Sequence, residues 1–67
     1  MVTRVDIAGS LEGAFDSGPL TRGQVIRAAD QRGAHKEVIA ALDQLPAGYY
    51  SHLRELWRHL GDVPRSA

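Results

Sequence analysis

The chain has 67 residues, too few to divide its apolar side chains between two cores, so residues 1–67 are expected to form one small domain. It contains no cysteine, which excludes a disulfide and a metal site built on thiolates. Because its eight basic and eight acidic side chains balance, with four of each sign in residues 1–33 and in residues 34–67, it lacks the basic excess typical of a nucleic-acid-binding protein.

The amino-terminal segment does not have the pattern expected of a targeting signal. Residues 1–10 have neither a basic leader nor a run of seven apolar residues, so we expect no secretory signal peptide. No stretch approaches the roughly 20 apolar residues of a membrane span. We therefore expect a cytoplasmic protein with no membrane partner.

The first expected helix covers residues 3–11 and is followed by a loop over residues 13–19. Its buried side chains would be Val5, Ala8 and Leu11. The loop is rich in Gly, Asp, Ser and Pro, and Phe15 is expected to attach it to the core.

The second helix, over residues 22–32, has the clearest start and end signals. Thr21 precedes it, and Gln24 follows three residues later, which is the pattern of a capping box. Gly33 is expected to end the helix in the left-handed conformation. Its buried side chains would be Val25, Ile26 and Ala29.

A third helix is expected over residues 35–45, where Pro46 stops it. Its buried side chains would be Val38, Ile39, Ala41, Leu42 and Leu45. A small residue on the second helix, a glycine in the turn and two aliphatic residues on the third helix have the spacing of a helix-turn-helix. We therefore expect these two helices to meet in a helix-turn-helix-like corner.

A fourth helix is expected to be capped by Ser51 and to end at Gly61. Its buried side chains would be Leu53, Leu56, Trp57 and Leu60. We find no strand pattern, and we expect residues 62–67 to fray, which leaves an ordered core over about residues 3–61. The predicted fold class is all-α, a compact four-helix domain with a helix-turn-helix-like central corner.

Several short motifs follow one another along the chain: Leu11-Glu12-Gly13, Phe15, Pro19-Leu20-Thr21-Arg22, Ala29, a Val38/Leu42/Leu45-Pro46 run and Tyr50-Ser51. In this order, over about residues 5–60, they resemble a family of small bacterial and archaeal proteins known as domain of unknown function 2795. This chain differs by the insertion of residues 16–18 between the aromatic residue and the proline, and by Arg22 in place of the usual lysine. The resemblance implies a compact helical fold, and it implies no activity and no site residues.

DNA binding by a regulator is the alternative function that the helix-turn-helix spacing suggests. If the third helix entered a major groove, its outward side chains would be Lys36, Glu37, Ala40, Asp43 and Gln44. Their charges sum to −1, which opposes the attraction to phosphate that supplies most non-specific affinity. Nucleic acid is therefore the less favoured partner.

Metal binding and catalysis have little support in the sequence. Besides His35, the chain has His52 and His59, which lie seven residues apart, about 10 Å along a helix and too far to share one metal. The serines lack the glycine-flanked turn of a hydrolase nucleophile. A domain of this size is also expected to leave little room for a ligand pocket of about 300 Å³ or more. We therefore expect that the protein is not an enzyme and binds neither a metal ion nor a cofactor.

The residues that we expect to bind a partner are Tyr49, Arg54 and Arg58. Tyr49 and Tyr50 are adjacent and cannot both point inward, and the family pattern implies that Tyr50 packs, so Tyr49 is left exposed where it could meet another protein. Arg54 and Arg58 are four residues apart and place like charges side by side.

These arginines have two interpretations. They either lay their stems over the rim of the core or meet an acidic patch on a partner. Because a core of this size without cross-links is marginal, association would also support the fold. The predicted function is a non-catalytic protein-interaction or assembly module that binds a protein partner or forms a homo-oligomer.

Overall fold

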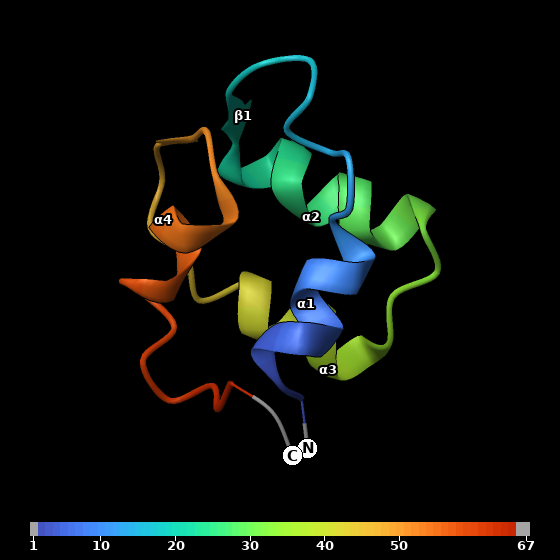
Figure 1. Cartoon of the computed structure of the whole chain (residues 1–67), viewed down its shortest axis with the longest axis vertical. Coiled ribbons are helices and arrows are strands. Elements are labelled where there is room, and N and C mark those ends of the chain that lie inside the picture. Colours follow the sequence, from blue (N-terminus) through green and yellow to red (C-terminus); the bar gives the residue numbers. More distant parts are fainter. Residues whose placement is uncertain (1, 66–67) are drawn as a thin grey trace.

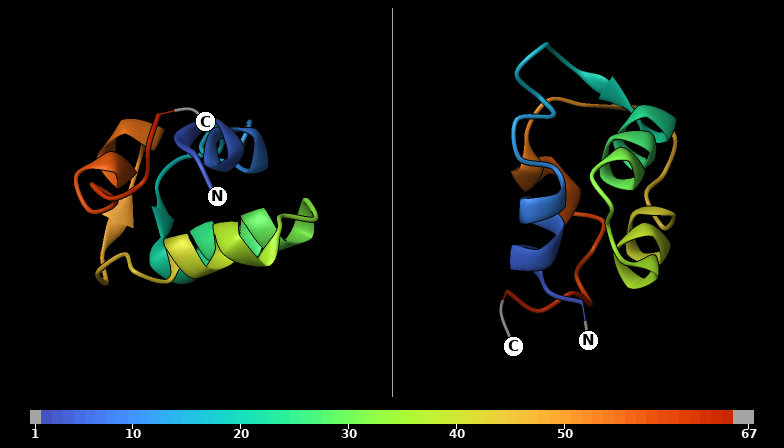
Figure 2. Two further views of the ribbon diagram at one scale, coloured as in Figure 1. Left: turned by 90° about the horizontal axis from the view of Figure 1, so that it is seen from below. Right: turned by 90° about the vertical axis from the view of Figure 1, so that its right-hand side faces the viewer.

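The computed structural model describes residues 2–65 and shows a mostly helical domain. Its elements in chain order are α1 (Arg4–Ser10), β1 (Leu20–Thr21), α2 (Arg22–Gln31), α3 (Lys36–Leu42), β2 (Tyr49–Tyr50) and α4 (Leu53–Trp57). Figures 1 and 2 show two layers, with α1 and α4 in one and α2 and α3 in the other. The four helices of the described chain confirm the expected mostly helical class.

The start and the end of α2 follow the sequence signals. Thr21 and Gln24 form the expected capping box: the Gln24 amide donates to the Thr21 hydroxyl, and the Thr21 amide donates to the Gln24 side chain. After α2, Gly33 has a φ of 75°. Its amide donates to the Asp30 carbonyl and the Ala34 amide to the Ala29 carbonyl, which together form a Schellman motif.

The central helix pair differs from a helix-turn-helix corner. Figures 1 and 2 show α2 and α3 side by side in roughly opposite directions, whereas the helices of a helix-turn-helix cross at a steep angle of about 90–120°. α3 also ends at Leu42, three residues before the expected end. Residues 43–45 continue as a tighter turn, in which the Leu45 amide donates to the Leu42 carbonyl, and Leu45 itself is still buried.

A short strand pair was not expected from the sequence. β1 and β2 each have two residues and pair antiparallel, with Leu20 opposite Tyr50 and Thr21 opposite Tyr49. The pair joins the start of α2 to the start of α4. The all-α prediction is therefore wrong in this detail. The strands escape prediction because two residues are too few to show the alternating pattern of a strand.

The carboxyl-terminal part also differs. α4 spans only Leu53–Trp57, and its N-cap is His52 instead of Ser51. The predicted fraying from Asp62 is wrong for residues 63 and 64: Val63 is 9% exposed, and the Pro64 carbonyl accepts a hydrogen bond of 2.8 Å from the Arg4 amide. Because these residues cover the start of α1, the packed chain extends beyond Gly61. Residues 66 and 67, also expected to fray, lie outside the described residues.

The core lies between the two layers. Its buried hydrophobic residues are Ile7, Leu11, Val25, Ala29, Val38, Ala41, Leu42, Leu45, Tyr50, Leu56, Leu60 and Val63. Phe15 packs against this cluster, as expected. The prediction for Val5 is wrong, since it is 63% exposed while Ile7 is fully buried. α1 therefore turns its Ile7–Leu11 face inward, and part of its other apolar face stays at the surface.

Candidate interaction surface

Tyr49 and Tyr50 point to opposite sides of β2, as successive residues of a strand do. Tyr50 is 4% exposed, and its hydroxyl donates a hydrogen bond to the Pro46 carbonyl. Its ring meets the His59 ring edge-on, with 6.1 Å between the centroids. Tyr49 is 76% exposed. The structure therefore confirms which tyrosine is buried, and it places Tyr49 on a backbone that its neighbour anchors.

Arg22 fixes the loop that leads to Tyr49. Its Nε donates to the Leu45 carbonyl at 2.7 Å, and its Nη2 donates to both the carbonyl and the carboxylate of Asp43 at 2.6 Å. The Arg22 amide also donates to the Gly48 carbonyl. One side chain at the start of α2 thus holds the end of α3. A planar guanidinium can bond several oxygens in this way, whereas an ammonium is a compact point charge.

Glu55 orders the start of α4. Its Oε1 accepts hydrogen bonds from the backbone amides of Ser51 at 2.6 Å and His52 at 3.0 Å. The Ser51 amide is the main cause that lowers the pKa of the Glu55 carboxyl below its ordinary value, with smaller contributions from His52 and the Arg58 charge and some opposition from desolvation. Glu55 therefore stays ionised and holds the turn between β2 and α4.

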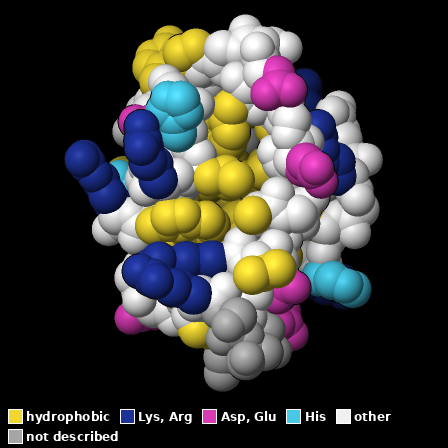
Figure 3. Space-filling view, in the orientation of Figure 1, with side chains coloured by type: hydrophobic (Ala, Val, Ile, Leu, Met, Phe, Trp, Pro, Cys, Tyr) yellow, Lys and Arg dark blue, Asp and Glu magenta, His cyan; other side chains and the backbone are white. Residues whose placement is uncertain are grey.

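Two of the three predicted binding residues share one hollow. A concavity of about 250 Å³ is lined by residues that include Tyr49, Glu55 and Arg58. Arg54 is exposed on α4, outside this lining. Figure 3 shows Lys and Arg side chains gathered over the α4 side of the molecule, beside a strip of hydrophobic side chains. We call the surface formed by Tyr49, Arg54 and Arg58 the tyrosine face.

The hydrophobic strip is a feature that the sequence did not reveal. Between α1, the loop after it and α4 lies a concavity of about 570 Å³, which we call the α1–α4 groove. Its apolar lining comprises Val5, Ala8, Leu11, Phe15 and Leu53, and its charged lining comprises Glu12 and Asp16. In Figure 3 the strip runs down the middle of the view, with acidic side chains on the side away from α4.

Beside this groove, Trp57 is only partly buried, although it was expected in the core. The guanidinium carbon of Arg4 lies 5.3 Å from the centre of its ring, at a distance typical of a cation–π contact. Arg4 thus covers part of the ring and attaches α1 to α4. This pair cannot be predicted from local sequence patterns, because 53 positions separate its members in the chain.

The comparisons with known proteins identify a family. The family model described as protein of unknown function (DUF2795) matches residues 2–57 of this chain. The chain belongs to this family. Comparison with curated proteins and comparison with solved structures give no match. In this DUF2795 protein, the recognised motifs form caps, turns and core: Thr21 caps α2, Arg22 holds the end of α3, and Tyr50 is buried in the core.

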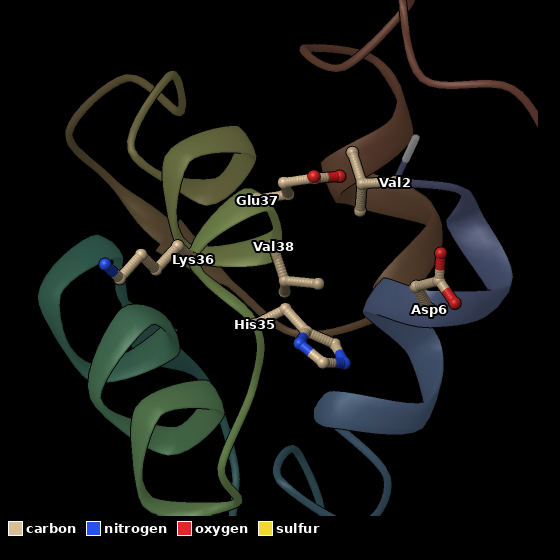
Figure 4. A pocket seen from close by; sticks show the side chains of 6 residues that line it. All are labelled: Val2, Asp6, His35, Lys36, Glu37 and Val38. Atoms are coloured by element: carbon tan, nitrogen blue, oxygen red, sulfur yellow. The ribbon is translucent and has the colours of Figure 1, made fainter.

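A further concavity of this DUF2795 domain lies between α1 and α3 and measures about 630 Å³. It is lined by Val2, Asp6, His35, Lys36, Glu37 and Val38. The lining is mostly exposed, so this is a hollow of the surface. In Figure 4, the His35 ring extends toward α1, whereas Lys36 extends away from it. The Asp6 carboxylate accepts hydrogen bonds from the Thr3 amide and hydroxyl and serves as a helix cap.

Residues 2–65 contain neither a metal-ligand cluster nor a candidate membrane span. No three His, Asp or Glu side chains of this part of the chain come together as the ligands of one metal ion would. The longest described helix, α2, has 10 residues, well short of the roughly 20 of a membrane span, and no candidate span is present. That the domain takes no cofactor stays a prediction.

Proposed function

We propose that this DUF2795 domain is a non-catalytic protein-interaction or assembly module that binds through the tyrosine face. The observation that carries the proposal is the 76% exposure of Tyr49 on a segment that is otherwise firmly held. Tyrosine is enriched at protein interfaces because its ring supplies a large contact area and its hydroxyl can still form hydrogen bonds.

The contacts that hold the backbone around Tyr49 matter as much as the exposure of its side chain. The buried ring of Tyr50, the Arg22 bonds to residues 43–48 and the Glu55 bonds to the next turn restrict the backbone on both sides of it. Because the backbone that carries Tyr49 is already ordered, partner binding has to order only its side chain, and less of the binding free energy is lost to ordering. Arg54 and Arg58 would add attraction to an acidic partner and increase the rate of association.

DNA binding by the α2–α3 pair has less support. The side chains that would reach the bases are exposed as expected: Lys36, Glu37, Ala40, Asp43 and Gln44. Their net charge is −1, and the Asp43 carboxylate is already paired with Arg22. The antiparallel course of the two helices also differs from the geometry in which a recognition helix projects into a major groove.

A double charge reversal tests the proposal. Arg54→Glu with Arg58→Glu should leave the domain folded by circular dichroism and should remove its association with protein, measured by light scattering and by native pull-down on the immobilised chain. The matched control is Arg27→Glu with Lys36→Glu, which makes the same change of charge at two exposed positions of the α2–α3 layer. Association that survives in the α4 variant, or is lost equally in the control, would exclude the tyrosine face as the binding surface.

A further inference from the structure

We infer that the partner of the tyrosine face is a second copy of this chain, and that the face enters the α1–α4 groove of that copy. This inference rests on the proposed function, since it names the partner of the same surface. It rests on two kinds of complementarity between the face and the groove, one in apolar surface and one in charge.

The apolar complementarity concerns two side chains. Among the described residues, the large hydrophobic side chains that are exposed are Tyr49, at 76%, and Val5, at 63%. Tyr49 lies on the tyrosine face and Val5 lines the α1–α4 groove. If a tyrosine face docks in a groove, both are removed from water in one contact, and Ala8, Phe15 and Leu53 contribute the rest of the apolar floor. A buried aromatic side chain in a pocket is the usual centre of a strong interface.

The charge complementarity matches this arrangement. The ionisable residues that line the groove are the acids Glu12 and Asp16, and both are exposed. The tyrosine face carries the bases Arg54 and Arg58, also exposed. The tyrosine face thus combines two bases with an exposed aromatic ring, and the groove combines an apolar floor with two acids on the side away from α4. Opposite potentials of this kind set the register of a contact and disfavour other partners.

The two surfaces use different residues of α4, so one chain can offer both at once. Leu53 contributes to the groove, whereas Arg58 lines the concavity beside Tyr49. Two chains could therefore exchange two equal contacts and close as a symmetric dimer, and a geometry that does not close would extend into a chain of copies. The stoichiometry found in solution decides between these two forms of the same contact.

A charge-swap complementation tests the inference. The first variant is Arg54→Glu with Arg58→Glu, which makes the face acidic, and the second is Glu12→Arg with Asp16→Arg, which makes the groove rim basic. Each variant alone sets like charges against each other, so its self-association should weaken at least about tenfold. When the two are mixed in equal amounts, each face meets a rim of opposite charge, and association should return to a 1:1 complex.

The outcomes separate the inference from the proposed function. If the first variant loses association but the second does not, or if the mixture fails to recover, the groove is not the partner and the inference is overturned, while the tyrosine face remains a binding surface. If the first variant associates as the parent does, the proposed function fails with it. Should the groove variant not fold, Glu12→Gln with Asp16→Asn removes the same charges without reversing them, and it should still weaken self-association. Unchanged association of that variant would overturn the inference.

Discussion

Replacing Arg22 by Met should weaken the fold more than its exposure suggests. The side chain is 34% exposed, yet its Nε bonds the partly buried Leu45 carbonyl and its Nη2 bonds two oxygens of Asp43. A hydrogen bond from a charged donor is worth about 1.5–3 kcal/mol, whereas an exposed ion pair contributes about 0–1 kcal/mol. The bond to Leu45 should therefore dominate, and we expect the free energy of unfolding to fall by about 2–3 kcal/mol.

This loss is large for so small a domain. At about 0.05–0.15 kcal/mol per residue, the whole chain should have a stability of roughly 3–10 kcal/mol. Urea unfolding followed by circular dichroism at one fixed protein concentration measures the change, and Arg27→Met, at an exposed position of the same helix, is the control. Asp43→Asn should cost less than about 1 kcal/mol, because it removes only the ion pair. If Arg22→Met is no more destabilising than Arg27→Met, the bonds to residues 43–45 do not hold the end of α3.

Three further predictions concern the backbone, the pH dependence and nucleic acid. Gly33→Val should destabilise the domain by at least about 1 kcal/mol, because the native φ of Gly33 is 75°. Gly23→Ala, at an open surface position of α2, should stabilise it by up to about 1 kcal/mol. Urea titrations in which Gly33→Val is as stable as the parent would refute the role of Gly33. Because the pKa of Glu55 is lowered, its carboxylate stabilises the fold above the ordinary pKa of about 4.5 and loses this effect as the pH falls. Glu55→Gln should therefore be less stable than the parent near neutral pH and equally stable in acid. Equal stability of the two proteins at neutral pH would contradict the capping role. Fluorescence anisotropy at physiological salt should detect no sequence-specific DNA binding, and tight binding with a steep salt dependence would show that the charge argument is wrong.

Local signals in the sequence were sufficient for the helix boundaries that depend on neighbouring residues. The capping box of Thr21 and Gln24 and the left-handed Gly33 involve partners at most five positions apart, so their geometry can be derived from residue types and spacing alone. The opposite exposure of Tyr49 and Tyr50 was predictable too, because adjacent residues cannot both face one core.

The features that the sequence did not reveal depend on distant parts of the chain. The pairing of β1 with β2 and the bonds from Arg22 to residues 43–45 join positions more than 20 residues apart. The hydrogen bond from the Arg4 amide to the Pro64 carbonyl likewise joins the two ends of the described chain.

The α1–α4 groove was missed for a different reason. Val5 and Ala8 have the spacing of a helix face that packs in the core. An apolar helix face that stays at the surface has the same spacing, so the sequence alone does not distinguish the two. Which side of α1 faces the core was decided by Ile7 and Leu11, and this choice left Val5 exposed.

Sedimentation equilibrium of the parent chain beside the Arg54→Glu, Arg58→Glu variant tests most directly whether the tyrosine face joins copies of this domain. The apparent mass of the parent should rise above the 7.3 kDa of one chain as the concentration increases to the high micromolar range, whereas the folded variant should stay at 7.3 kDa. A parent that remains at 7.3 kDa throughout, or a variant whose mass rises as the parent's does, would contradict self-association through this face.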